Sequence, residues 1–162
     1  MNIIINIDDV DPDHIFYQNP VKNTIMDNSN FIRLIYSTNY YTLNNVLIEI
    51  TFNIDKVIRH YEKYIYEFDC LKNDKVIKKI HNLEKTILSR ADINDKHPVY
   101  RIYNQLTCNN IKLYTTLAKT KDINNKLNHK KKVKYILKIS GIWESTYPAN
   151  EYGLTYKFIE VV

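Results

Sequence analysis

A lysine-rich stretch holds the clearest candidates for chemistry in this sequence. Eight lysines fall between positions 119 and 138, namely Lys119, Lys121, Lys126, Lys130, Lys131, Lys132, Lys134 and Lys138. Asp122 is the one carboxylate in that range, and His129 adds a positive charge below about pH 6.5. Because phosphate is the natural counterion of such a cluster, the pattern predicts contact with a nucleic-acid backbone, and a solvated lysine-rich loop is the alternative.

Aromatic side chains follow the lysines and could stack on nucleobases. They are Tyr135, Trp143, Tyr147, Tyr152, Tyr156 and Phe158. A base stacked on such a ring gains about 1–3 kcal/mol, and small β-barrels bind single strands in this way. Strands also use aromatic residues for packing, and alternation places Tyr135 on one face with Leu137 and Ile139, so we expect most of these rings in the core. We expect Trp143 and Tyr147 to be exposed.

An acidic turn near the start of the chain could hold a metal ion. Its acids are Asp8, Asp9, Asp11 and Asp13, and His14 follows them. Clustered carboxylates bind Mg²⁺ in phosphoryl-transfer sites, but such a site needs acids from a second segment as well. Glu49, on the nearest expected strand, is a lone partner. We therefore expect a solvated turn without a metal ion.

The other motifs of enzymes and cofactor sites are missing from the sequence. No two of the five histidines are four positions apart, and none lies at zinc spacing from a cysteine. The only glycines, Gly141 and Gly153, are 12 residues apart, which excludes a glycine-rich phosphate loop. Cys70 falls among expected core residues, where a thiol is usually inert, although a pair of a cysteine and a histidine could still assemble in space. We expect no cofactor and no enzymatic activity.

Composition indicates a folded chain. It has 162 residues, of which 44% are apolar and 12% aromatic, and its net charge is only +5. Its apolar runs are far shorter than the ~20 residues of a membrane helix, so we expect no membrane partner. The two isolated cysteines and the start without a charged segment predict an intracellular setting and no secretion.

Hydrophobic periodicity predicts one α+β domain over residues 1–162. Alternating runs indicate strands near 2–7, 31–38, 46–52, 111–116, 134–143 and 153–161, and steps of three and four indicate helices near 55–72, 75–90 and 98–108. We expect a hairpin of 31–38 with 46–52, and the first two helices packed as a pair. Terminal strands must pair, so the architecture is a mainly antiparallel sheet or a small open β-barrel with an inserted helical pair.

Asparagines are expected to replace glycine at turns that require positive φ, because the chain has so few glycines. The candidates are Asn39, Asn44, Asn45, Asn73, Asn109, Asn110, Asn124 and Asn125. They would supply the tight turns between the predicted elements.

Four segments of the sequence resemble a known family. They are Lys138-Ile139-Ser140-Gly141-Ile142-Trp143-Glu144, Tyr152-Gly153-Leu154-Thr155-Tyr156-Lys157-Phe158, Phe31-Ile32-Arg33-Leu34-Ile35-Tyr36-Ser37 and Thr42-Leu43-Asn44. Over about two thirds of the chain they are similar to an uncharacterised family of large double-stranded DNA viruses of eukaryotes, the mimivirus-like and phycodnavirus-like groups. Asn45 departs from that pattern, in which a glycine follows Leu43-Asn44. The resemblance implies a viral protein made in the cytoplasm or nucleus of an infected cell, and implies no catalytic residue.

These observations favour a non-enzymatic module that binds nucleic acid, single-stranded and without strong sequence choice, through the lysines, Trp143 and Tyr147. The sequence favours neither DNA nor RNA as the partner. The alternative is a structural or adaptor protein that docks onto a viral or host protein, for which the basic charge serves solubility.

Overall fold

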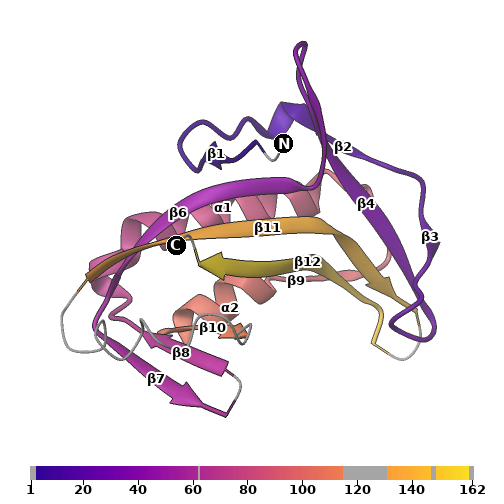
Figure 1. The fold of residues 1–162 in the computed structure, drawn as a ribbon. Coiled ribbons are helices and arrows are strands. Elements are labelled where there is room, and N and C mark those ends of the chain that lie inside the picture. Colours follow the sequence, from indigo (N-terminus) through magenta and orange to yellow (C-terminus); the bar gives the residue numbers. More distant parts are fainter. Residues whose placement is uncertain (1–2, 62, 115–130, 147–148, 161–162) are drawn as a thin grey trace.

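One long strand, β11 (Lys131–Ser145), organises the fold. The computed structural model describes residues 3–61, 63–114, 131–146 and 149–160. One edge of β11 pairs in antiparallel fashion with β12 (Glu151–Glu160). Its other edge pairs first with β6 (Val46–Ile54) and then, beyond Gly141, with β4 (Ser29–Ser37) (Figure 1). The predicted α+β class is confirmed, and the sheet is open rather than closed into a barrel.

The remaining elements extend this sheet or cover it. In chain order they are β1 (Ile5–Asn6), the 3-10 turn η1 (Pro12–His14), β2 (Ile15–Tyr17), β3 (Val21–Lys22), β5 (Thr42–Asn44), β7 (Lys56–His60), β8 (Lys63–Glu67), η2 (Leu71–Asn73), α1 (Asp74–Ser89), β9 (His97–Val99), α2 (Arg101–Thr107) and β10 (Asn110–Tyr114). Strands β2, β3 and β5 pair with β4, while β1 and β9 add in parallel to β6 and β12. A second sheet has the order β10-β8-β7.

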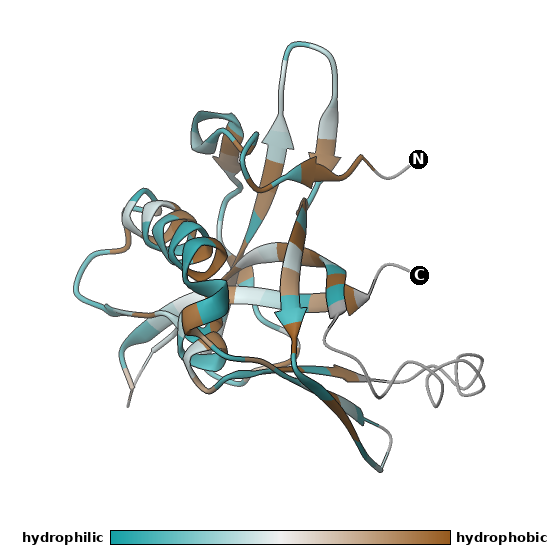
Figure 2. Cartoon of the chain, turned by 90° about the vertical axis from the view of Figure 1, so that its left-hand side faces the viewer, coloured by the Kyte–Doolittle hydropathy of each residue, from teal (hydrophilic) through white to brown (hydrophobic). Residues whose placement is uncertain are grey.

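The hydrophobic core lies on one side of the large sheet. Alternate residues of β6 are buried, from Val46 to Ile54, and on β11 they are opposed by Tyr135, Leu137 and Ile139. Both helices cover this side, and no helix of the described chain covers the other (Figure 2). The sheet therefore has a packed face and a helix-free face.

A β-bulge between Ile139 and Gly141 changes which residues of β11 face the core. Ile139 lies opposite Tyr156, whereas Gly141 lies opposite Thr155, so the extra residue reverses the alternation after the bulge. Tyr135, Leu137 and Ile139 share the packed face, as predicted. After the bulge, Gly141 and Trp143 belong to the helix-free face instead.

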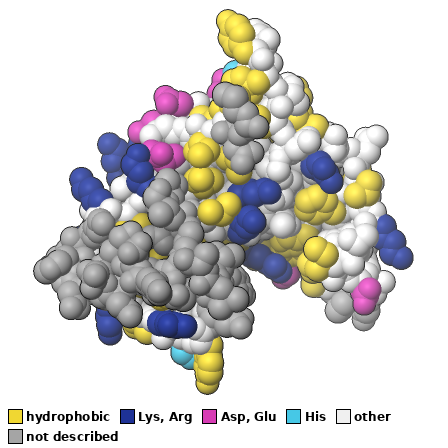
Figure 3. All heavy atoms as spheres, in the orientation of Figure 1, with side chains coloured by type: hydrophobic (Ala, Val, Ile, Leu, Met, Phe, Trp, Pro, Cys, Tyr) yellow, Lys and Arg dark blue, Asp and Glu magenta, His cyan; other side chains and the backbone are white. Residues whose placement is uncertain are grey.

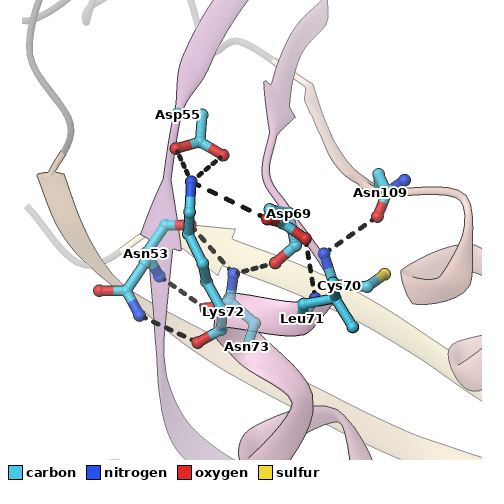
Figure 4. Close-up of polar contacts among 8 residues, drawn as sticks. All are labelled: Asn53, Asp55, Asp69, Cys70, Leu71, Lys72, Asn73 and Asn109. Atoms are coloured by element: carbon cyan, nitrogen blue, oxygen red, sulfur yellow. Dashed lines mark hydrogen bonds and ion pairs between the residues drawn. The ribbon is translucent and has the colours of Figure 1, made fainter.

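A buried asparagine holds α1 against the sheet (Figure 4). The side-chain oxygen of Asn73 accepts a hydrogen bond from the backbone N–H of Asn53 at 2.8 Å, and its Nδ2 donates to the carbonyls of Asn53 and Asp69. Lys72 adds an ion pair with Asp55 at 3.0 Å. Asn73 thus pairs with β6 much as a neighbouring strand would, and it ties the start of α1 to the sheet.

The helix predicted over 55–72 is wrong, because this segment forms the hairpin of β7 and β8. Its apolar residues fit helical steps, but they are β-branched or aromatic and so favour strands. Tyr64, Tyr66 and Phe68 alternate into the core, and Tyr61 turns the chain with a φ of 54°. The expected pair of long helices is therefore absent from the described chain, and α1 packs on the short α2.

Two local predictions need smaller corrections. Residues 31–38 and 46–52 do not form a hairpin with each other, because β4 and β6 both pair with β11, one after the other. The helix predicted over 98–108 begins only at Arg101, because Pro98 belongs to β9 and lies beside β12.

Asparagines do supply positive φ, as expected for Asn45 and Asn109, and Asn28 and Asn150 do so too. The residue that departs from the family pattern, Asn45, has a φ of 113°. Asn73, which was also expected to have a positive φ, has a φ of −112°. Neither glycine has positive φ, so both must serve another purpose.

Candidate nucleic-acid interface

The helix-free face carries an array of basic side chains. Residues opposed in register share a face, and Lys138 of β11 lies between Leu47 of β6 and Lys157 of β12. Lys132 and Lys134 share this face by alternation, as does Arg33, which is opposite Gly141. Figure 3 shows Lys and Arg side chains at the centre of this face, beside hydrophobic ones.

The basic side chains have few acidic partners. From Lys132 to Trp143, the one carboxylate at the opposed positions of this face is Glu49, which binds Lys134 at 2.9 Å. Lys138 and Lys157 are opposed directly, and neither forms an ion pair with any described residue. Because like charges in opposed positions repel, this pair is unfavourable without an anion.

One hollow lies on this face, and a second lies at its β12 edge, where residues of α2 also line it. The smaller, about 470 Å³, we call the Ile136 hollow; it is lined by Leu47, Ile136, Lys138, Lys157 and Ile159, with residues of the β1 and β5 segments. The larger, about 750 Å³, we call the Trp143 hollow, and its volume lies within the usual range of ligand sites. Lys157 lines both, so the two hollows adjoin.

The Trp143 hollow combines positive charge with an apolar wall. Its cations are Lys22, Arg33, Arg101 and Lys157, and its apolar side chains include Val21, Ile25, Met26 and Phe31. None of the described residues that line it is a carboxylate. The hollow therefore suits an anion with an apolar body.

Trp143 itself is buried, so the expectation that it is exposed is wrong. Its side chain is 3% exposed, and Arg101 covers it, with the guanidinium carbon 4.0 Å from the ring centroid. Its Nε1–H has no acceptor among the described residues. A buried donor without a partner is unusual in native proteins and calls for an explanation.

Both glycines make room for the rings of this hollow. A Cβ at Gly153 would lie 2.9 Å from Cζ2 of Trp143, and a Cβ at Gly141 would collide with the ring of Phe31. Phe31, Trp143 and Gly153 are opposed in register across three strands. Glycine is thus required here for close approach rather than for backbone conformation.

Tyr156 fixes α2, and with it Arg101, at the rim of the hollow. Its hydroxyl lies 2.6 Å from Oε1 of Gln105 and 3.2 Å from the carbonyl oxygen of Arg101. Burial raises the pKa of Tyr156 to about 12, and the charge of Glu84 adds to this, so the hydroxyl remains a donor at neutral pH.

The predicted binding residues fall into two groups, those outside the described residues and those that the structure places. Lys119, Lys121, Lys126, Lys130 and Tyr147 lie outside the described residues, as does the side chain of Lys131. Lys132, Lys134 and Lys138 lie on the helix-free face. The sequence reasoning missed Lys22, Arg33, Arg101 and Lys157; alternation along residues 31–38 and 153–161 could have placed Arg33 and Lys157.

The acidic turn contacts α1 instead of forming a cluster. Asp8 pairs with Lys79, and Asp13 pairs with Arg90 at 2.7 Å. Asp11 accepts a hydrogen bond from the backbone of Asp13. In the described chain, no three metal-ligating side chains come together.

The environment of Cys70 does not favour a reactive thiolate. The Cys70 thiol donates to the carbonyl of Leu106 at 3.2 Å, and burial raises its pKa, which disfavours the reactive thiolate. His81 stacks on Tyr103, with ring centroids 3.9 Å apart, rather than meeting a cysteine.

The fold and its face together define an open-faced α+β protein with a basic, partly apolar surface. Neither described helix has the length and apolar character needed to cross a membrane. No family model, no curated protein and no solved structure matches the chain.

Proposed function

We propose that the protein is a non-enzymatic module that binds single-stranded nucleic acid on its helix-free face, without strong sequence choice. The observation that carries this proposal is the opposed pair of Lys138 and Lys157, which lacks a described acidic partner on a face with other unpaired cations. A phosphate backbone would neutralise these charges. The resemblance to viral sequences adds the proposal that the strand is bound inside an infected cell.

Apolar side chains beside the lysines favour a single strand over a duplex. Ile136 and Ile159 are opposed next to the lysine pair, and Phe31 is half-buried in the Trp143 hollow. The bases of a single strand are free to contact such groups, whereas a duplex hides them in its stack. Nonspecific apolar contacts also account for binding without sequence choice.

A salt series on matched variants tests this proposal. Each phosphate contact on a single strand contributes about −0.7 to the slope of log K against log salt. We expect Lys138→Ala combined with Lys157→Ala to weaken oligonucleotide binding and to make the slope shallower by about 1.4, corresponding to two contacts. Fluorescence anisotropy with a labelled single-stranded oligonucleotide between about 50 and 200 mM salt measures both quantities.

The control has the same net charge. Lys75→Ala combined with Lys85→Ala removes two exposed lysines from α1, on the opposite side of the sheet. This variant should keep the wild-type slope. Equal slopes for the two double variants, or wild-type binding that ignores salt, would exclude the proposal.

A docking surface for a viral or host protein is the second candidate. It is favoured by Ile25 and Val21, which are 92% and 58% exposed beside the Trp143 hollow, and by β12, whose outer edge is paired by β9 only as far as Gly153. An extended partner segment could add to that edge. Under this alternative the wild-type protein binds the oligonucleotide no better than the Lys138/Lys157 double variant does.

A further inference from the structure

We propose that the Trp143 hollow binds a phosphomonoester, and that its occupant is the phosphorylated end of a strand held on the helix-free face. This inference rests on the proposed function, since the strand would enter from the neighbouring Ile136 hollow. Lys157 lines both hollows and would contact the backbone where it passes from one to the other.

The charge of the hollow exceeds what an internal phosphate needs. A phosphodiester carries one negative charge, whereas a phosphomonoester carries about −1.5 to −2 at pH 7. Lys22, Arg33, Arg101 and Lys157 all line the Trp143 hollow, and none of them forms an ion pair with a described carboxylate. Two of them are arginines, whose planar guanidinium groups can donate two parallel hydrogen bonds to phosphate oxygens. A terminal phosphate therefore complements the hollow better than a backbone phosphate does.

The buried indole points to an acceptor-rich ligand as well. Trp143 lines the hollow, and its Nε1–H is the hydrogen-bond donor for which the described residues provide no acceptor. Gly153 allows the ring to lie against the backbone of β12, and Arg101 closes over it. This nitrogen is enclosed, so a phosphate oxygen would reach it and complete its hydrogen bonding only when the side chains that cover it, Arg101 among them, shift.

The apolar wall would hold the last nucleoside. Phe31 sits over Gly141, with Met26 and Val21 on the same wall. A base has a flat face that contacts an aromatic ring regardless of sequence, which agrees with binding without sequence choice. The hollow thus has a place for both parts of a terminal nucleotide.

The test uses the single tryptophan as the reporter. Three oligonucleotides of one sequence, with a 5′-phosphate, a 3′-phosphate or neither, are titrated into the full chain, followed by thymidine monophosphate alone. Anisotropy gives the affinity, and Trp143 emission reports the hollow. We expect one phosphorylated end to bind about tenfold tighter than the unphosphorylated strand and to change the emission.

Variants separate the hollow from the rest of the face. Arg101→Gln and Arg33→Gln should each reduce the preference for the phosphorylated end, while Arg101→Lys, which keeps the charge but not the planar fork, should restore it in part. Lys138→Ala should weaken all three oligonucleotides equally. Lys75→Gln on α1 should change nothing.

The outcomes distinguish this inference from the proposed function. Equal, salt-dependent affinity for all three oligonucleotides overturns the inference and leaves the function intact. If no oligonucleotide binds but thymidine monophosphate changes the Trp143 emission, and does so only with Arg101 present, the hollow takes a free nucleotide and the strand-binding function is overturned. If neither oligonucleotide nor mononucleotide has an effect, both proposals fail.

Discussion

At the scale of single residues, the Asn73 side chain is expected to contribute strongly to the stability of the folded state. It is 3% exposed, and its three hydrogen bonds all go to backbone groups of β6 and of the segment before α1. Asn73→Ala should lower the free energy of unfolding by about 2–4 kcal/mol, because each buried group left without a partner costs about 1–3 kcal/mol. Urea denaturation measures this difference.

A second substitution at the same position sharpens the test. Asn73→Asp keeps the acceptor for the Asn53 N–H but removes both donors and adds a buried charge, so it should destabilise more than alanine does at neutral pH. Asn82→Ala, at an exposed position of α1, should change stability by less than about 0.5 kcal/mol. If Asn73→Ala were as mild as Asn82→Ala, the backbone pairing would not contribute as described.

At the scale of elements, local patterns predicted the strands well and the middle of the chain poorly. Alternation along β6, β11 and β12 is strong because each strand has one buried face. The segment of β7 and β8 satisfies helical and strand periods alike, and only its pairing with β10 and the burial of Tyr64 and Tyr66 decide between them. The bulge after Ile139 is also invisible in the sequence, since it depends on the register with β12.

The position of α2 depends on a carboxylate from another element. Buried Glu84 of α1 accepts hydrogen bonds from the backbone N–H groups of Ile102 and Tyr103, each at 3.0 Å, and so caps α2. Burial raises the pKa of Glu84 above its ordinary value, although these two hydrogen bonds act against the shift. The stability that Glu84 contributes is therefore complete below the ordinary pKa and is lost as the pH rises through the folded-state pKa.

Glu84→Gln tests this pH dependence because glutamine cannot ionise, although its single side-chain oxygen can accept only one of the two N–H bonds. The variant should be less stable than the wild type in acid, because it loses one bond, and this difference should shrink as the pH rises toward neutrality. Denaturation across that range gives the difference, with Glu67→Gln on the small sheet as the control. A variant that instead loses stability relative to the wild type as the pH rises would mean that the two backbone bonds outweigh burial.

At the scale of the whole molecule, the candidate site could be predicted only in part. Lysines 132, 134 and 138 belong to the segment whose charge is evident in the sequence, and strand alternation places them together. Arg33 and Arg101 join them because β4 pairs with the far half of β11 and α2 begins at the sheet edge, and no local pattern encodes either arrangement. This basic surface is assembled from five segments, β3, β4, α2, β11 and β12, and can be recognised only when the sheet order is known.

On this basic surface, a substitution that improves stability should weaken nucleic-acid binding. Since Lys138 and Lys157 repel each other across the strands, Lys157→Glu should create an opposed ion pair and raise the free energy of unfolding by about 0.2–1 kcal/mol. It should also weaken oligonucleotide binding more than Lys157→Gln does, because it places a negative charge between the two hollows. Urea denaturation and anisotropy on the same preparations measure the two effects. If the basic charge of this face serves only solubility, Lys157→Glu should raise the stability and leave oligonucleotide binding unchanged. A Lys157→Glu protein that binds like the wild type would therefore exclude a role for this charge in holding a strand.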